Sequence, residues 1–113
     1  METIFAKIIR KEIPADIVFE SETVLAFRDI NPQAPTHVLV IPKEPISQLS
    51  EVKPEHSEIL GELLLAVAEI ARKLNLDSDG YRVVINNGER AGQTVFHLHL
   101  HLLAGRELGW PPG

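Results

Sequence analysis

Cysteine is absent from this chain of 113 residues. Its absence excludes disulfide bonds, iron–sulfur clusters, zinc fingers and a cysteine nucleophile.

Long apolar runs and basic clusters are also missing. The longest apolar runs, such as residues 63–68, fall far short of the roughly 20 residues that a membrane-spanning helix needs. The formal net charge is −5, with 11 Lys and Arg against 16 Asp and Glu. This balance argues against nucleic acid as a partner, although neutral donors can still hold one small phosphate ligand. The N-terminal residues do not resemble a signal peptide, so we expect a cytoplasmic protein with no membrane partner.

Composition and length favour one folded domain over residues 1–113. Hydrophobic residues make up 44% of the chain and charged residues 24%, which is close to the average of globular proteins. The sequence contains no repeat, low-complexity tract or linker that would divide it. A chain of this size buries enough surface to form a core without disulfide bonds or structural metals.

Hydrophobic periodicity predicts five strands and two helices, one short and one long. The expected helices cover residues 3–11 and 54–74, and the expected strands cover 17–19, 24–27, 36–42, 81–86 and 95–103. The strand 36–42 is apolar on both faces and is expected at the centre of a sheet. Hairpin connections around one long helix predict an α+β fold with a mainly antiparallel sheet.

The long predicted helix is more hydrophobic than one buried face requires. Leu65 and Ala66 widen its apolar stripe beyond the residues that recur at three- and four-residue steps. Either the helix is buried over most of its circumference, or it also packs against a second subunit.

Three of the five histidines stand at alternate positions, at His97, His99 and His101. Because side chains alternate between the faces of a strand, the three imidazoles are expected on one face. The intervening leucines, Leu98, Leu100 and Leu102, would then point into the core. Three histidines on one face indicate a functional site.

Two chemistries are compatible with this site. In the first, the histidines bind a metal, with His37 as a further ligand and Asp29 as the main acidic candidate. In the second, a neutral imidazole acts as a nucleophile, which it can do at neutral pH because its pKa is near 6.5. Phosphorus is the natural electrophile for an imidazole, and the absence of a carboxylate cluster favours this second interpretation.

The loop before the histidines supports a phosphate site. Gly88 and Gly92 allow the backbone to approach an anion closely, and Gln93 and Thr94 add neutral donors. Asn86, at the end of the preceding predicted strand, can direct an amide toward the same place.

The histidine motif, with its two following apolar residues, resembles that of the histidine triad (HIT) family, in particular its nucleotide-binding Hint branch. The similarity extends over essentially the whole chain, through residues 4–15, 29–37, 92–95 and 110–113. The combination of the triad, the segment around Asp29 and the ending Trp110-Pro111-Pro112-Gly113 is specific to that branch.

The resemblance implies a HIT fold in a homodimer whose sheet continues across the two-fold axis. It implies hydrolysis of purine nucleoside 5′-phosphoramidates, and of aminoacyl adenylates, to a nucleoside monophosphate and an amine. The reaction would proceed through a covalent nucleotidyl-histidine, with no metal and no cofactor. The expected ligands are purine nucleotides, namely AMP, GMP and their phosphoramidates.

The resemblance also implies a role for individual residues. His99 would be the nucleophile, and His97, His101 and His37 would flank the phosphate and position or protonate it. Thr94 stands where the family usually has a serine near the leaving group. The phosphate would lie beside Asn86, Gly92, Gln93, Thr94, Val95, His99 and His101.

The nucleoside would lie between Asp29 and an apolar slot. Asp29 can accept hydrogen bonds from the ribose hydroxyls, as acidic residues do in other nucleotide folds. The slot would consist of Ile4, Phe5, Ile8, Phe27, Ile30 and Leu39, which on the sequence alone are simply core residues. Trp110 of the partner subunit would lie beside the leaving-group pocket.

Two other functions remain open. One is a regulatory module that binds a nucleotide without turnover, although binding alone needs no nucleophile. The other is a dinucleoside polyphosphate hydrolase of a related branch, against which the ending 110–113 argues.

Overall fold

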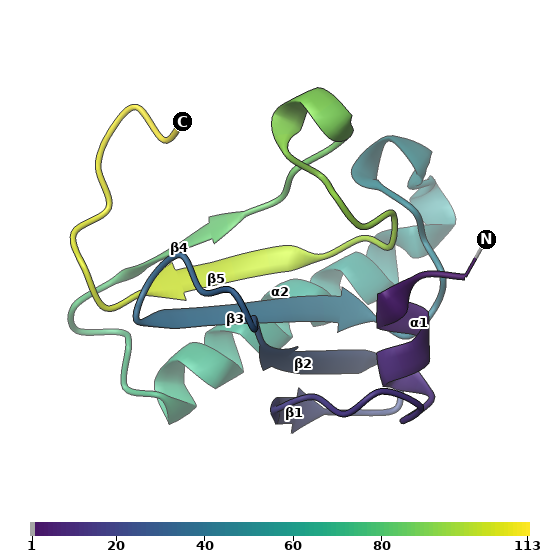
Figure 1. The fold of residues 1–113 in the computed structure, drawn as a ribbon, viewed down its shortest axis with the longest axis horizontal. Helices are drawn as coiled ribbons and strands as arrows, with labels where there is room; N and C mark the ends of the chain where they lie inside the picture. The colour runs from purple at the N-terminus through teal and green to yellow at the C-terminus, as the bar shows by residue number, and fades with distance from the viewer. Residues whose placement is uncertain (1) are drawn as a thin grey trace.

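The computed structural model describes residues 2–113, which form a five-stranded sheet in the order β1-β2-β3-β5-β4 (Figure 1). The strands are β1 (Ile17–Glu20), β2 (Val24–Arg28), β3 (Thr36–Pro42), β4 (Tyr81–Val84) and β5 (Leu100–Ala104). Every neighbouring pair is antiparallel, and β3 lies at the centre. The predicted α+β class and the central position of strand 36–42 are confirmed.

A short helix, α1 (Ile4–Ile9), and a long helix, α2 (Ser57–Lys73), complete the fold. Thr3 caps α1, because its Oγ1 accepts a hydrogen bond from the N–H of Ala6 at 3.1 Å. Three 3-10 turns, η1 (Leu49–Glu51), η2 (Pro54–His56) and η3 (Glu89–Ala91), lie in the connections. Pro54 begins the turn that leads into α2, as expected of a residue without an N–H.

The two helices pack against opposite faces of the sheet. On the face toward α2, Val38 and Val40 of β3 join Leu100 and Leu102 of β5 in the larger hydrophobic cluster. On the other face, the alternate residues Leu25, Phe27, Leu39 and Ile41 pack with Phe5 and Ile8 of α1. Figure 1 shows α2 running behind the sheet. On each strand, the side chains that face α1 therefore alternate with those in the larger cluster, which face α2.

The last strand is shorter than predicted, because β5 begins at Leu100 and residues 95–99 are irregular. The ladder between β3 and β5 extends only as far as the pair Val40 and Leu100. Pro42, which would lie opposite Leu98, has no N–H to donate to a further rung. Leu98 instead donates its N–H to the carbonyl of Ile46 at 2.7 Å, in the loop after β3.

The strand predicted for residues 81–86 ends at Val84, which is paired with His101. Ile85 would lie opposite Leu100, the first residue of β5, but is not part of the ladder. Asn86 would lie opposite His99, which precedes β5, so it has no strand to join. Of the two alternatives for α2, burial over most of its circumference does not hold within the described chain, because Leu64 and Leu65 are 56% and 71% exposed.

The C-terminal segment 105–113 leaves the sheet and is held near the edge strand β4. Arg82 of β4 donates from Nη2 to the carbonyl oxygens of Leu108 at 3.2 Å and Gly109 at 2.8 Å. Trp110 does not pack on the core of its own chain, since it is 83% exposed. Within residues 2–113, no helix is both long and apolar enough to cross a membrane.

Candidate active site

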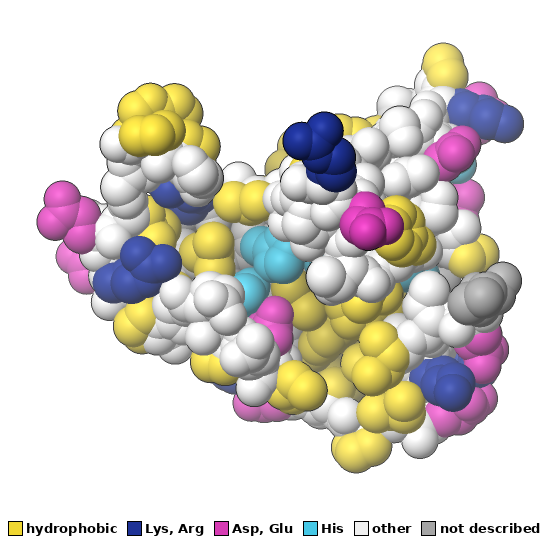
Figure 2. All heavy atoms as spheres, turned by 45° about the horizontal axis from the view of Figure 1, so that its top comes forward, with side chains coloured by type: hydrophobic (Ala, Val, Ile, Leu, Met, Phe, Trp, Pro, Cys, Tyr) yellow, Lys and Arg dark blue, Asp and Glu magenta, His cyan; other side chains and the backbone are white. Residues whose placement is uncertain are grey.

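A cleft of about 580 Å³ lies between the C-terminal segment and the loop that precedes the histidines. Figure 2 shows histidine side chains visible inside this hollow, with apolar surface beside them. Its lining brings together many of the residues that the sequence singled out. They are Asp29, Asn31, Gln33, His37, Val84, Asn86, Gly92, Thr94, His101, Leu103 and Pro112.

The four predicted site histidines come from two kinds of structure. His37 lies on β3 and His101 on β5, and His101 is paired with Leu39, on the face toward α1. His97 and His99 lie in the irregular segment before β5, so the expectation of three histidines on one strand is wrong for these two. The alternation itself persists, because Leu98, Leu100 and Leu102 are buried in the main core.

His97 holds the irregular segment against the end of β3. Its Nε2 lies 2.7 Å from the carbonyl oxygen of Pro42. Because a carbonyl oxygen only accepts, Nε2 carries the hydrogen of this bond. His97 is 3% exposed and its ring is edge-on to Phe5 of α1. The side chain therefore braces the segment that carries His99.

His99 is held as the tautomer that a nucleophile requires. Its Nδ1 donates to the carbonyl oxygen of His97 at 2.7 Å, which leaves Nε2 with a free lone pair. Among the described residues, none donates to that Nε2. Burial lowers the pKa of His99, more than its bond to the His97 carbonyl raises it. The ring is therefore neutral at neutral pH.

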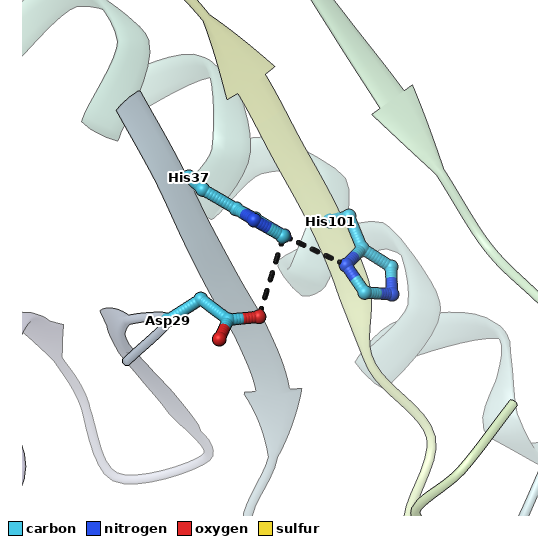
Figure 3. Close-up of side chains that lie close together, drawn as sticks. All are labelled: Asp29, His37 and His101. Atoms are coloured by element: carbon cyan, nitrogen blue, oxygen red, sulfur yellow. Dashed lines mark hydrogen bonds and ion pairs between the residues drawn. The ribbon is translucent and has the colours of Figure 1, made fainter. Parts of the chain in front are cut away.

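His37 and His101 form a second ordered pair (Figure 3). The N–H of Gln33 donates to Nδ1 of His37 at 3.0 Å, so the hydrogen of His37 is on Nε2. That Nε2 lies 2.9 Å from Nδ1 of His101, which must accept. His101 consequently carries its hydrogen on Nε2, a buried atom that has no hydrogen-bond partner within residues 2–113. An N–H donor is thus left available beside His99, whose ring centroid is 5.0 Å away.

Burial keeps these rings neutral. Burial is the main cause that lowers the pKa of His101 to about 4, and the neighbouring His99 and His37 lower it further. Burial also lowers the pKa of His37, against a smaller opposing effect of Asp29. The tautomers assigned above apply to these neutral imidazoles.

Asp29 lies beside this pair at the wall of the cleft. Its Oδ1 accepts from the N–H of Asn31 at 2.8 Å, and its Oδ2 is 3.5 Å from Nε2 of His37. Ligand atoms of Asp29, His37 and His101 lie within 4.8 Å of one another, a spacing that a metal ion can use. However, the nitrogens of His37 are already bonded to Gln33 and His101. A metal would have to break the hydrogen bond between the two histidines to gain a lone pair there.

The loop before the histidines is built around Gln93, which is 1% exposed. Its Nε2 donates to the carbonyls of Ser47 at 2.9 Å and Val95 at 3.1 Å, and its Oε1 accepts from the N–H of Gly88 at 2.8 Å. Its own N–H donates to the carbonyl of Gly88. The expectation that Gln93 donates to a phosphate is therefore wrong: its donors hold the loop. The side-chain donors of the loop that line the cleft belong to Asn86 and Thr94, since the N–H of Gly92 donates to the carbonyl of Glu89 at 3.0 Å.

The six residues of the expected slot divide into two groups. Phe5, Ile8, Phe27 and Leu39 lie in one buried cluster, against which Val95 packs. Ile4 is 46% exposed and Ile30 is 97% exposed, so neither is a core residue. A second hollow, of about 530 Å³, is lined by Ile4, Thr94, Val95 and Phe96 among others, and it meets the cleft at Thr94.

Sequence reasoning missed contributions that the backbone makes. The N–H of Gln33 and the carbonyls of Pro42 and His97 orient three of the histidines. No side-chain pattern identifies such groups. It also missed Pro112, which lines the cleft of its own chain, whereas the resemblance placed the C-terminal segment at the partner's site.

Comparison with known proteins gives consistent matches. The sequence model of the HIT domain matches residues 10–108. The chain is 62% identical over 112 residues to an uncharacterized HIT-like protein of Synechococcus elongatus, with 99% of this chain and 97% of that protein covered. It is 56% identical over 113 residues to the 14 kDa zinc-binding protein of Zea mays, covering 98% and 88%. It is 51% identical over 108 residues to the purine nucleoside phosphoramidase of Escherichia coli, covering 96% and 91%.

A solved structure has the same fold. The crystal structure of a HIT family hydrolase from Legionella pneumophila superposes with a TM-score of 0.97 at 48% identity, covering 99% of this chain and all of that one.

Proposed function

The chain belongs to the HIT family, as a nucleotide hydrolase, and from this premise we propose that it cleaves purine nucleoside 5′-phosphoramidates and aminoacyl adenylates. The products are a nucleoside monophosphate and, for a phosphoramidate, an amine. The similarity to the phosphoramidase of Escherichia coli, at 51% identity, supports the reaction class.

The proposal rests on one observation: a nitrogen of His99 with a free lone pair lies near an N–H donor of His101. His99 has its Nε2 free, and the adjacent His101 has an unpartnered Nε2–H. A nucleophile beside a hydrogen-bond donor is the arrangement that attack on an anionic phosphoryl group requires. His97 and His37 hold these two rings in the necessary tautomers through the bonds described above.

In the first step, Nε2 of His99 attacks the α-phosphorus while the bond from phosphorus to the leaving nitrogen breaks. The Nδ1–H of His99 stays on the His97 carbonyl, which stabilises the positive imidazolium that forms. The Nε2–H of His101 donates to a non-bridging phosphate oxygen. Because His101 is neutral at pH 7, the departing nitrogen takes its proton from water, through the hydroxyl of Thr94.

In the second step, water attacks the phosphorus of the nucleotidyl-histidine. The new bond from oxygen to phosphorus forms as the bond from Nε2 to phosphorus breaks, and a proton passes to solvent. His99 regains its lone pair, and the nucleoside monophosphate leaves. No metal and no cofactor takes part in this scheme.

The nucleoside lies on the side of the cleft where Asp29 and the apolar residues meet. The side chain of Asp29 keeps 20% of its surface exposed, which leaves oxygen lone pairs for the ribose hydroxyls. Phe5, Ile8, Phe27 and Leu39 form the floor for a flat base, and the exposed Ile4 and Ile30 border it. An apolar slot discriminates weakly between bases, so both AMP and GMP fit this arrangement.

The active form is a homodimer in which Trp110 of each subunit reaches the leaving-group side of the partner's cleft. Two features support it: β4 lies at the edge of the sheet formed by the described residues, and Trp110 is an indole that is 83% exposed there.

The decisive experiment is to trap the intermediate. The protein is incubated with an adenosine phosphoramidate, quenched in alkali and examined by intact mass and peptide mapping. An AMP adduct on His99 is expected, and His99→Gly should form none. A second arm adds excess chelator: loss of hydrolysis that zinc restores would replace this mechanism with a metal mechanism at Asp29, His37 and His101.

A further inference from the structure

Arg106, which follows β5, is hydrogen-bonded to Gln33, in the loop between β2 and β3 that lines the cleft. Its Nε and Nη2 both donate to the carbonyl oxygen of Gln33, at 3.2 and 3.0 Å. Its remaining nitrogen, Nη1, donates to the carbonyl of Glu107 at 3.0 Å, so all three nitrogens of the guanidinium are hydrogen-bonded. Two donors of one planar group on one oxygen restrict that oxygen more than a single bond does.

The chain approaches this loop unusually closely. Gly105 has φ of 98°, and a Cβ added there would lie 2.8 Å from Cβ of Pro35. A residue with a side chain would therefore be strained in its backbone and would collide with the loop. This close approach places Arg106 directly over Gln33.

Gln33 is held by its backbone at two points. Its N–H donates to Nδ1 of His37, and its carbonyl accepts from Arg106. Its side-chain amide bonds only to Asn31, within the same loop. Across residues 2–113, His37 and Arg106 are thus the two hydrogen-bond partners that tie Gln33 to the rest of the fold.

We infer that Arg106 is a positioning residue, which keeps the N–H of Gln33 on His37 and thereby sets the tautomers of His37 and His101. The consequence for catalysis rests on the function proposed above. The consequence for the tautomers does not.

The tautomers of His37 and His101 are coupled, because one ring must donate and the other accept in the hydrogen bond between them. If the N–H of Gln33 leaves Nδ1 of His37, that nitrogen can carry the hydrogen and Nε2 becomes an acceptor. His101 must then donate from Nδ1 to keep the bond of 2.9 Å between the rings. Its buried Nε2 would then carry a lone pair instead of an N–H beside His99. A lone pair facing an anionic phosphate is repulsive, so the cleft loses a donor where charge develops.

The test is the protonation of the two rings, measured without substrate. Long-range ¹⁵N–¹H spectra at pH 7.5 distinguish a protonated from an unprotonated imidazole nitrogen in the wild type, Arg106→Ala and Arg106→Lys. Lysine keeps the charge but cannot place two donors of a planar fork on one oxygen. We expect Nδ1 of His37 to be unprotonated in the wild type and mixed in both variants, with the larger change in Arg106→Ala.

Arg82→Ala is the matched control for the spectra. Arg82 also donates to two backbone carbonyls of the C-terminal segment, but not to Gln33. Its replacement should leave the His37 and His101 signals as in the wild type. Wild-type tautomers in Arg106→Ala, or an equal change in Arg82→Ala, would overturn the inference.

Kinetics provide the second measurement. With an adenosine phosphoramidate, kcat should fall about tenfold in Arg106→Ala, while KM changes less than about threefold. Arg72→Ala, which removes an exposed arginine of α2, should keep the wild-type kcat. An unchanged kcat in Arg106→Ala would refute the catalytic part. If the wild type itself shows no hydrolysis, the proposed function fails, and the spectra still decide the role of Arg106.

Discussion

His99 donates its Nδ1 hydrogen to the backbone carbonyl of His97, two positions earlier in the same chain, at 2.7 Å. The tautomer of His99 is therefore set by the main-chain carbonyl of His97. A substitution of the His97 side chain leaves that acceptor in place, whereas a change in the path of segment 95–99 does not.

Replacement of His99 should separate turnover from binding. His99→Ala removes the attacking nitrogen but leaves the donor of His101 and the carboxylate of Asp29 in place. We expect turnover of an adenosine phosphoramidate to fall at least about a thousandfold, with AMP affinity by calorimetry within about threefold of the wild type. Comparable losses in both quantities would contradict the assignment of His99 as nucleophile.

Acid should destabilise the folded protein through the site histidines. The pKa of His101 is lowered from 6.5 to about 4 in the folded state, chiefly by burial. Between these values the unfolded chain binds a proton that the folded chain does not, so the free energy of unfolding falls as pH falls through this window. The loss from His101 alone amounts to about 3 kcal/mol at most.

Urea unfolding at pH 7 and pH 5 measures this effect. His101→Asn, which retains hydrogen-bonding groups but does not titrate, serves as the matched variant. Its free energy of unfolding should change less between the two pH values than that of the wild type. Parallel pH dependences would show that His101 does not contribute.

Recognition of ribose by Asp29 predicts an asymmetry between substrates. A site built to accept hydroxyl hydrogens penalises a substrate that lacks them, because its own polar group is left unpaired. A 2′-deoxy substrate should therefore lose kcat/KM by about tenfold or more in the wild type, and much less in Asp29→Ala. Identical 2′-deoxy penalties in the two proteins would exclude Asp29 as the ribose ligand.

The exposed end of the chain should influence the choice of leaving group. Deletion of residues 110–113 is expected to leave the dimer and AMP binding largely intact, because the proposed dimer is joined through the sheet and these residues lie outside the core. It should change the ranking of kcat/KM across phosphoramidates that differ only in their amine. Sedimentation velocity and a series of amines measure the two effects, and an unchanged ranking would remove this role from the C-terminal segment.

Local patterns were sufficient to predict most of the fold. The alternation of leucines around His99 and His101 gave the buried face of the last strand, and Thr3 gave the start of the first helix. The end of the ladder at Val40 was not predicted, because it depends on Pro42 lying opposite a residue more than fifty positions away. The alternation of histidine and leucine therefore extends through residues 97–99, although β5 begins only at Leu100.

The candidate site was predicted as a set of residues but not as a set of bonds. Gln93 carries donors suited to a phosphate, yet all of them are used within the protein. Ile30 is hydrophobic, yet it is 97% exposed at the end of the turn after β2. Both outcomes depend on contacts between distant segments, which composition and spacing do not encode.

The length of the loop after β3 limits where the chain can be extended by protein engineering. The carbonyls of Pro42, Ile46 and Ser47 receive hydrogen bonds from segment 93–98, so this loop positions the segment that carries His99. One inserted residue between Pro42 and Ser47 would shift these acceptors relative to one another. Peptide tags and reporter domains therefore belong in the exposed turn 77–79, which makes none of these bonds to the site within residues 2–113.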